Sequence, residues 1–120
     1  MPHFVLEYTD NIYERSNVKP FLKTIHKILI EDKEFRLDQI KSRSIEHNQY
    51  YISNGDDKEA FVYLTLSILQ GKSAKQKHEI GQKMLVSLEE YFNKSIRNLN
   101  CRIIFEIREI IAENYYYIPY

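Results

Sequence analysis

The chain has 120 residues, 43% of them hydrophobic, so it is long enough to bury one core and requires no second domain. Its 17 basic and 17 acidic residues cancel, which argues against generic nucleic-acid or anionic-membrane partners. The single cysteine excludes an intrachain disulfide, and neither a signal pattern nor an apolar run of membrane length occurs. We therefore expect one soluble, cytoplasmic domain over residues 1–120.

Residues 3–9 alternate in polarity with a period of two, which predicts a half-buried strand. Asp10 and Asn11 then end it. The alternation puts two sets of side chains on opposite faces: Phe4, Leu6 and Tyr8 on one, and His3, Val5 and Glu7 on the other.

Pro2 stands directly behind Met1 at the head of this strand. Methionine is usually removed before so small a second residue, and the chain would then begin with a secondary amine. Burial in an apolar pocket and nearby cations would lower the pKa of that amine toward neutrality. A base with such a pKa can move protons to and from carbon. The alternative is that Pro2 stands here by chance, as one of three prolines.

An amphipathic helix is predicted over residues 18–32, with Pro20 in its first turn, where the missing N–H costs little. A second strand is predicted over residues 39–52. The sequence Ser53-Asn54-Gly55-Asp56 follows and supplies the residues that a tight turn requires.

Residues 60–70 are too apolar for a strand with one wet face, which predicts a central position in the sheet. Ser73 and Gln76 match a capping box, and the following apolar stripe predicts a helix to about Lys94. A last strand is predicted over residues 101–110. The aromatic tail at 111–120 must dock on the core or a neighbouring subunit, or line the mouth of a substrate site.

The elements form two βαβ units, a weak pseudo-repeat over residues 2–52 and 58–110. This order predicts an α+β fold, in which two parallel strand pairs join through Asn54-Gly55 into one four-stranded mixed sheet. Two helices cover only one face of such a sheet. We expect the other face to be apolar and open, and self-association to cover it.

The chain resembles the tautomerase superfamily, and within it the 5-carboxymethyl-2-hydroxymuconate delta-isomerase family. The resemblance spans nearly the whole chain, in the order and at the spacing of that family. It is carried by Pro2-His3-Phe4, Glu7-Tyr8, Asn11-Ile12, Ile40-Lys41-Ser42-Arg43, Phe61 to Leu66, Gly71-Lys72-Ser73, Phe105-Glu106-Ile107 and Glu109.

The resemblance implies a homotrimer with inward-facing sheets that isomerises a small anionic enol or dienol carboxylate without a metal or organic cofactor. Pro2 would be the general base, and Arg43 would belong to the Ser-Arg pair of the family. Lys41 and Lys72 stand where relatives more often carry arginine. These cations would hold substrate carboxylates and stabilise the developing dienolate.

Three departures from the family pattern leave alternatives open. Lys41 and Lys72 lack the bidentate fork of a guanidinium, and Tyr63 stands where relatives often carry histidine. The chain could instead act on an aryl pyruvate or hydrate an unsaturated acid, or it could be a non-catalytic trimer that binds a ligand or protein. As isolated residues, Arg43 and Lys41 could also be ordinary surface charges. Lys72, before a helix start, could equally be an ordinary charge or mark a bound anion. The four histidines are interpreted as structural or solvent-facing, and Cys101 as a small core residue rather than a nucleophile.

Overall fold

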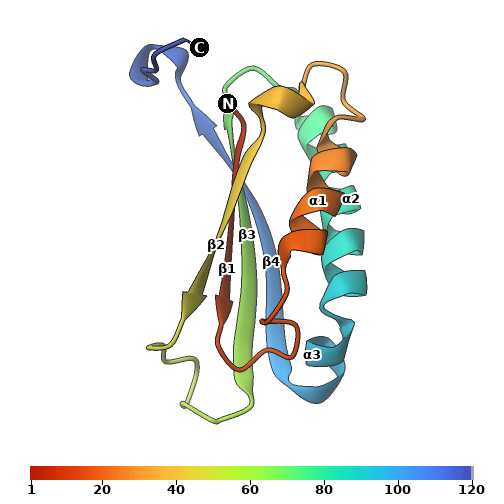
Figure 1. The fold of residues 1–120 in the computed structure, drawn as a ribbon, viewed down its shortest axis with the longest axis vertical. Coiled ribbons are helices and arrows are strands. Elements are labelled where there is room, and N and C mark those ends of the chain that lie inside the picture. Colours follow the sequence, from red (N-terminus) through yellow and green to blue (C-terminus); the bar gives the residue numbers. More distant parts are fainter. Residues whose placement is uncertain (120) are drawn as a thin grey trace.

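The computed structural model of the chain describes residues 1–119, so Tyr120, the last residue of the expected tail, lies outside the described residues. Four strands form one mixed sheet in the order β2-β1-β3-β4 (Figure 1). Their bounds are β1 His3–Thr9, β2 Lys41–His47, β3 Glu59–Leu69 and β4 Asn100–Ile110. β1 pairs parallel with β2, β3 pairs parallel with β4, and β1 pairs antiparallel with β3. The predicted α+β fold with a mixed sheet is confirmed.

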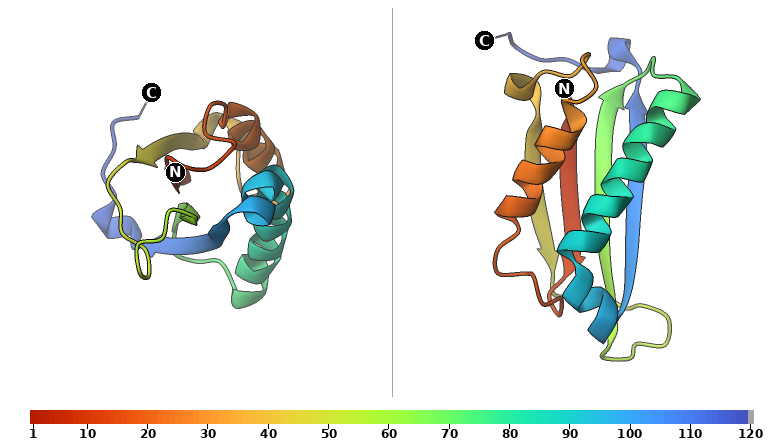
Figure 2. Two further views of the ribbon diagram at one scale, coloured as in Figure 1. Left: turned by 90° about the horizontal axis from the view of Figure 1, so that it is seen from below. Right: turned by 90° about the vertical axis from the view of Figure 1, so that its right-hand side faces the viewer.

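Two main helices, α1 Lys19–Leu29 and α2 Ala74–Tyr91, and the short α3 Asn93–Asn98 lie on the same side of the sheet (Figure 2). The 3-10 turns η1 Leu37–Gln39 and η2 Ala112–Asn114 complete the structure. Within residues 1–119, no helix combines the length and apolarity needed to cross a membrane. The strands and main helices follow the order β1-α1-β2 and β3-α2-β4; that the two units are a repeat stays a prediction.

The start of α2 was predicted correctly and its end was not. The Ser73 side chain accepts a hydrogen bond from the Gln76 N–H, and the Gln76 side chain accepts one from the Ser73 N–H, so the capping box is present. The helix stops at Tyr91 because Phe92 leaves helical dihedral angles. Its fully buried ring packs 5.1 Å from the ring of Phe21 between centroids, which turns the chain into α3.

β2 is shorter than the predicted strand over residues 39–52. It lies at the edge of the sheet, where β1 is its sole partner, and β1 ends at Thr9 opposite His47. The N–H of Asp10 donates the last bond to the His47 carbonyl, at 3.0 Å. The chain then loops outward to a turn in which the Gly55 N–H bonds the Ile52 carbonyl at a positive φ of 82°.

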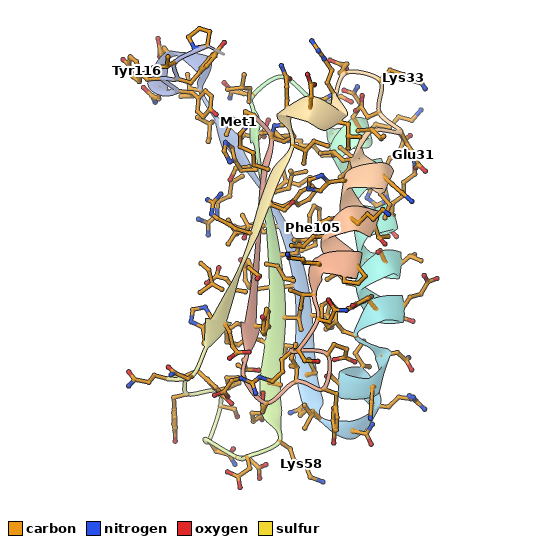
Figure 3. The ribbon with its side chains drawn as sticks, viewed as in Figure 1. Met1, Glu31, Lys33, Lys58, Phe105 and Tyr116 are labelled. Carbon is orange, nitrogen blue, oxygen red and sulfur yellow. The ribbon has the colours of Figure 1, made fainter. Side chains whose placement is uncertain are left out.

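The hydrophobic core lies between the sheet and the helices. Alternate residues of β1 and β3 point into it and are fully buried. Figure 3 shows the Phe105 side chain directed into the same layer from β4. The side chains that fill it from both layers include Phe4, Leu6, Val62, Leu64, Leu66, Phe21, Ile25, Met84 and Leu88.

The open face of the sheet is a mixed surface and not the apolar one that we expected. The strand registers place charged and hydroxyl side chains there among the apolar ones. His47 Nε2 lies 2.9 Å from Glu7 Oε1, and the Tyr63 hydroxyl donates to Glu106 Oε1 at 2.9 Å. The apolar members include Val5, Ile45, Phe61 and Ile104. Polar pairs on this face satisfy one another locally, so any partner would meet a mixed surface.

Candidate active site

Pro2 is buried at the start of β1, and its carbonyl accepts a hydrogen bond from the Lys41 N–H at 3.2 Å. The N-terminus lies at the same end of the molecule as the C-terminal tail, the segment between α1 and β2, and the loop before α2 (Figure 1). Three stretches that are distant in sequence therefore meet around the first residues.

Two hollows flank Met1, and both are also lined by Gln39 and Leu69. The first, here called the tail pocket, has a volume of about 330 Å³ and is completed by Lys41, Tyr115, Tyr117 and Ile118. The second, here called the loop pocket, has a volume of about 350 Å³ and includes Glu34, Phe35, Ile68, Gly71 and Lys72 in its wall. The chain terminus thus lies between two cavities of a size suited to a small ligand.

Lys41 and Arg43 lie two residues apart on β2 and share the open face with His3 of β1. Burial lowers the pKa of the Met1 α-amino group, and the Lys41 ammonium lowers it further. Burial also lowers the pKa of His3, with further contributions from the terminal amine, Arg43 and Lys41. The structure therefore brings Pro2, Lys41 and Arg43 to one region, where burial and Lys41 favour the neutral form of the Met1 α-amino group.

Lys72 meets a different environment. Its ammonium lies 2.9 Å from Asp32 Oδ2 and 2.9 Å from Glu34 Oε1, and 4.4 Å from the centroid of the Phe35 ring. Burial by itself lowers the pKa of Lys72, but the hydrogen bonds to the two carboxylates outweigh it and raise the pKa. The negative charge expected beside Lys72 therefore comes from the Asp32 and Glu34 carboxylates of the chain.

The pKa of Asp32 is also affected by its contact with Lys72. Partial burial raises it, but the hydrogen bonds from Lys72 and from the Glu34 N–H, with the attraction of Lys72 and Lys83, together lower it. The cluster also reaches α2, because the Gln76 side-chain amide donates to Glu34 Oε1 at 3.3 Å. Lys72 therefore ties the segment after α1 to the start of α2.

Sequence reasoning missed the hydrogen bond between His3 and Tyr115 in this region. His3, interpreted as structural, has its Nε2 3.1 Å from the Tyr115 hydroxyl, while its buried Nδ1 has no hydrogen-bond partner among the described residues. The rings of Tyr115 and Tyr117 lie 5.7 Å apart between centroids. The aromatic run was visible in the sequence, and lining a substrate mouth was one of its suggested uses; the hydrogen bond to His3 carried no local signal.

Other residues singled out in the sequence have structural partners. His26 Nε2 lies 2.5 Å from Ser42 Oγ on the helix side of the sheet. Burial, with a smaller effect of Glu14, raises the pKa of the Cys101 thiol to about 11, which suits a structural cysteine better than a nucleophile. In the part of the chain that the structure describes, no three His, Cys, Asp or Glu side chains are grouped to hold a metal ion.

A model of the 5-carboxymethyl-2-hydroxymuconate isomerase family matches residues 2–117. The chain belongs to this family. A curated relative, the 5-carboxymethyl-2-hydroxymuconate Delta-isomerase of Escherichia coli, is 26% identical over 110 residues, which cover 92% of this chain and 87% of the relative. The chain is accordingly an isomerase, and its predicted place in the tautomerase superfamily is confirmed.

Solved structures agree with this assignment. A 5-carboxymethyl-2-hydroxymuconate isomerase from Deinococcus radiodurans R1 superposes with a TM-score of 0.91 at 26% identity, covering 99% of this chain and 90% of the other. A structure described as a fused 4-OT wild type symmetric trimer superposes with a TM-score of 0.68 at 11% identity, covering 91% and 85%. The second likeness shows the fold alone.

Proposed function

We propose that the chain, after removal of Met1, is a cofactor-independent isomerase that moves a proton on an enol or dienol carboxylate, with the Pro2 amine as general base. The 5-carboxymethyl-2-hydroxymuconate of the relatives is the model for such a substrate. The observation that carries the proposal is the terminus beside two hollows, where burial and Lys41 lower the pKa of the Met1 α-amino group. Removal of Met1 would free the Pro2 nitrogen beside the two hollows that Met1 lines.

The reaction requires this base and cationic side chains that bind the substrate carboxylate. The Pro2 nitrogen takes a proton from the enol hydroxyl or a carbon, the electron pair moves through the conjugated system, and the proton returns to a distant carbon. No electron is gained or lost overall. Arg43 and Lys41 would hold the carboxylate and stabilise the negative charge that develops on the dienolate.

We also propose a homotrimer in the cytoplasm. The open face of the sheet carries exposed Arg43 and Ile45 in the single chain, and structures of the same fold are described as symmetric trimers. A closed trimer that covers this face would enclose Arg43 near the terminus and exclude water from the site. The free Cys101 suits a reducing compartment.

Pro2→Ala tests the base directly. The substituted amine should lower kcat by roughly 100-fold or more, the range expected for loss of a positioned general base. Turnover would be followed by ultraviolet absorbance on a panel of hydroxymuconates and arylpyruvates, with intact mass confirming that Met1 is absent. The oligomeric mass should stay unchanged. Equal kcat for Pro2→Ala and the parent protein would refute the assignment of the base.

A fraction of the protein that keeps Met1 provides a second test, because its Pro2 nitrogen is an amide without basicity. That fraction should be inactive. If protein from its native cells keeps Met1, the function is instead that of a non-catalytic trimer that binds a ligand or another protein. The pairing of Lys72 with Asp32 and Glu34 favours this second candidate, since it occupies a cation that substrate would otherwise use.

A further inference from the structure

The two sides of the terminus differ in charge. On the loop-pocket side, Lys72 contributes +1 and its two contacting carboxylates contribute −1 each, so the cluster has a formal charge of 1 − 2 = −1. The Lys72 side chain is only 9% exposed, which leaves little of the ammonium open to a ligand. A substrate carboxylate placed here would meet an already occupied cation and the carboxylate of Glu34, whose side chain is 68% exposed.

On the tail-pocket side, the wall is apolar and aromatic with a cation at its edge. Tyr115, Tyr117, Ile118 and Leu69 line it together with Lys41. The hydrogen bond between His3 and the Tyr115 hydroxyl holds the first ring in place beside β1. Aromatic rings bind flat conjugated or aryl groups through their faces and edges. Among the described residues that line this wall, Lys41 is the one basic side chain, so a second carboxylate at the far end of a ligand would meet no lysine or arginine there.

Arg43 completes the contrast. Among residues 1–119 it has no ion-pair partner, and it lies beside Val5 in the register, one step along the face from Lys41. A carboxylate can therefore be held at the β2 side of the terminus, where an arginine offers a bidentate contact. The opposite side offers charge of the wrong sign.

We propose that the substrate of this isomerase is a monoanionic enol acid. Its single carboxylate lies at Lys41 and Arg43, and its uncharged aromatic or apolar end lies against Tyr115 and Tyr117, in place of a second carboxylate at Lys72. This substrate class rests on the proposed function, because it assumes that the reacting atoms lie at Pro2.

A matched pair of substrates tests the charge requirement. The enol form of phenylpyruvate carries one carboxylate and an aryl group, whereas 2-hydroxymuconate carries two carboxylates. With protein that lacks Met1, we expect kcat/KM for the aryl enol acid to exceed that for the dicarboxylate by about tenfold or more, the factor given by 1.4 kcal/mol. A preference for 2-hydroxymuconate would overturn the inference while leaving the proposed function in place.

Glu34→Gln tests the origin of that preference. It removes one carboxylate and leaves Asp32 paired with Lys72, so the fold should be retained. We expect the kcat/KM ratio of dicarboxylate to aryl substrate to rise several-fold. The same ratio in the variant and the parent protein would show that the cluster of Lys72, Asp32 and Glu34 has a structural role only and does not set the substrate preference.

The tail provides its own control. Tyr117→Ala should lower kcat/KM for the aryl enol acid by roughly tenfold, since an aromatic contact and its buried area are lost. Tyr116→Ala should leave it unchanged, because Tyr116 is 89% exposed, does not line the pocket, and lies on the outer side of the tail (Figure 3). Equal effects of the two substitutions would contradict the aromatic wall.

Binding measurements separate failure of this inference from failure of the proposed function. If neither substrate is turned over, the proposed reaction fails, and calorimetry with the unreactive acids cinnamate and cis,cis-muconate still decides the ligand class. Tighter binding of cinnamate, weakened by Tyr117→Ala, would support a monoanionic ligand. Tighter binding of muconate, or equal binding of both acids, would overturn it.

Discussion

The two faces of β3 differ in their roles: one contributes to the stability of the core, and the other is available to a ligand or a partner. Val62, Leu64 and Leu66 point toward the helices and are fully inaccessible to solvent. Tyr63 and Thr65, which alternate with them in sequence, point to the other face. On that face the Tyr63 hydroxyl donates a hydrogen bond to Glu106. Lys41 and Arg43 lie on the same face, on β2. Stability is therefore concentrated on one face, while the other is free to carry charge.

The largest expected effect on stability comes from a substitution on the helix-covered face of β3. Leu64→Ala should lower the free energy of unfolding by about 2–5 kcal/mol, because it deletes a fully buried side chain and leaves a cavity. Ser67→Ala, on the open face of the same strand, should change it by less than about 1 kcal/mol. Urea unfolding at one fixed protein concentration measures both.

A smaller or equal loss for Leu64→Ala than for Ser67→Ala would remove the contrast between the two faces. It would mean that the open face, covered in the oligomer, contributes as much to stability as the core. Repeating both measurements at a tenfold lower protein concentration would expose such a contribution from assembly.

The next effect concerns function on the open face. Arg43→Ala should lower kcat/KM for an anionic substrate by roughly 10- to 100-fold, the loss of one charge-assisted hydrogen bond, and should leave the unfolding free energy nearly unchanged. Arg97→Ala is the matched control, since Arg97 is an exposed arginine on α3, at the opposite end of the molecule (Figure 1). Unfolding of the Arg43 variant would make this residue structural.

The smallest expected effect is the pH dependence of stability that arises from two histidines on opposite faces of the sheet. Burial lowers the pKa of both His3 and His26, and the terminal amine, Arg43 and Lys41 lower that of His3 further. Since the folded values lie below the ordinary value of about 6.5, the unfolded state binds more protons, and stability should fall as pH drops below about 6.5. Each contribution should be lost fully once pH is below the lowered value.

Ligand binding should separate these two histidines. A bound carboxylate near Lys41 and Arg43 offsets their charge and should raise the pKa of His3, whereas His26, behind the sheet, should keep its value. A titration of the imidazole resonances by nuclear magnetic resonance, with and without saturating cinnamate, measures both. A shift at His26 as large as that at His3 would place the anion elsewhere.

Much of the fold could be predicted because its signals are local. The period-two alternation of residues 3–9, the apolar run of β3 and the capping box at Ser73 each act within a few residues. The break at Phe92 could not be predicted, because it depends on a ring of α1 far away in sequence. The length of β2 likewise depends on where its partner strand ends.

The candidate site divides in the same way. Pro2 directly precedes β1, and Lys41 and Arg43 lie on the neighbouring strand β2. The pairing of these strands follows from the predicted topology, so the proximity of the three residues was foreseeable. The carboxylates that hold Lys72 come from a loop about 40 residues earlier, and no sequence pattern links the two segments. The hydrogen bond that joins His3 to Tyr115 spans 112 residues, and it too follows only from the three-dimensional structure.

The state of Cys101 has a practical consequence. A thiol with a pKa of about 11 on the core side of β4 is almost entirely protonated at neutral pH, so it reacts slowly with alkylating reagents in the native chain. Because the Cys101 side chain is only partly buried, a maleimide can reach it in the folded chain, and the raised pKa of the thiol slows the reaction. With only one cysteine in the sequence, a faster labelling rate would report greater exposure or a lower pKa of this one thiol.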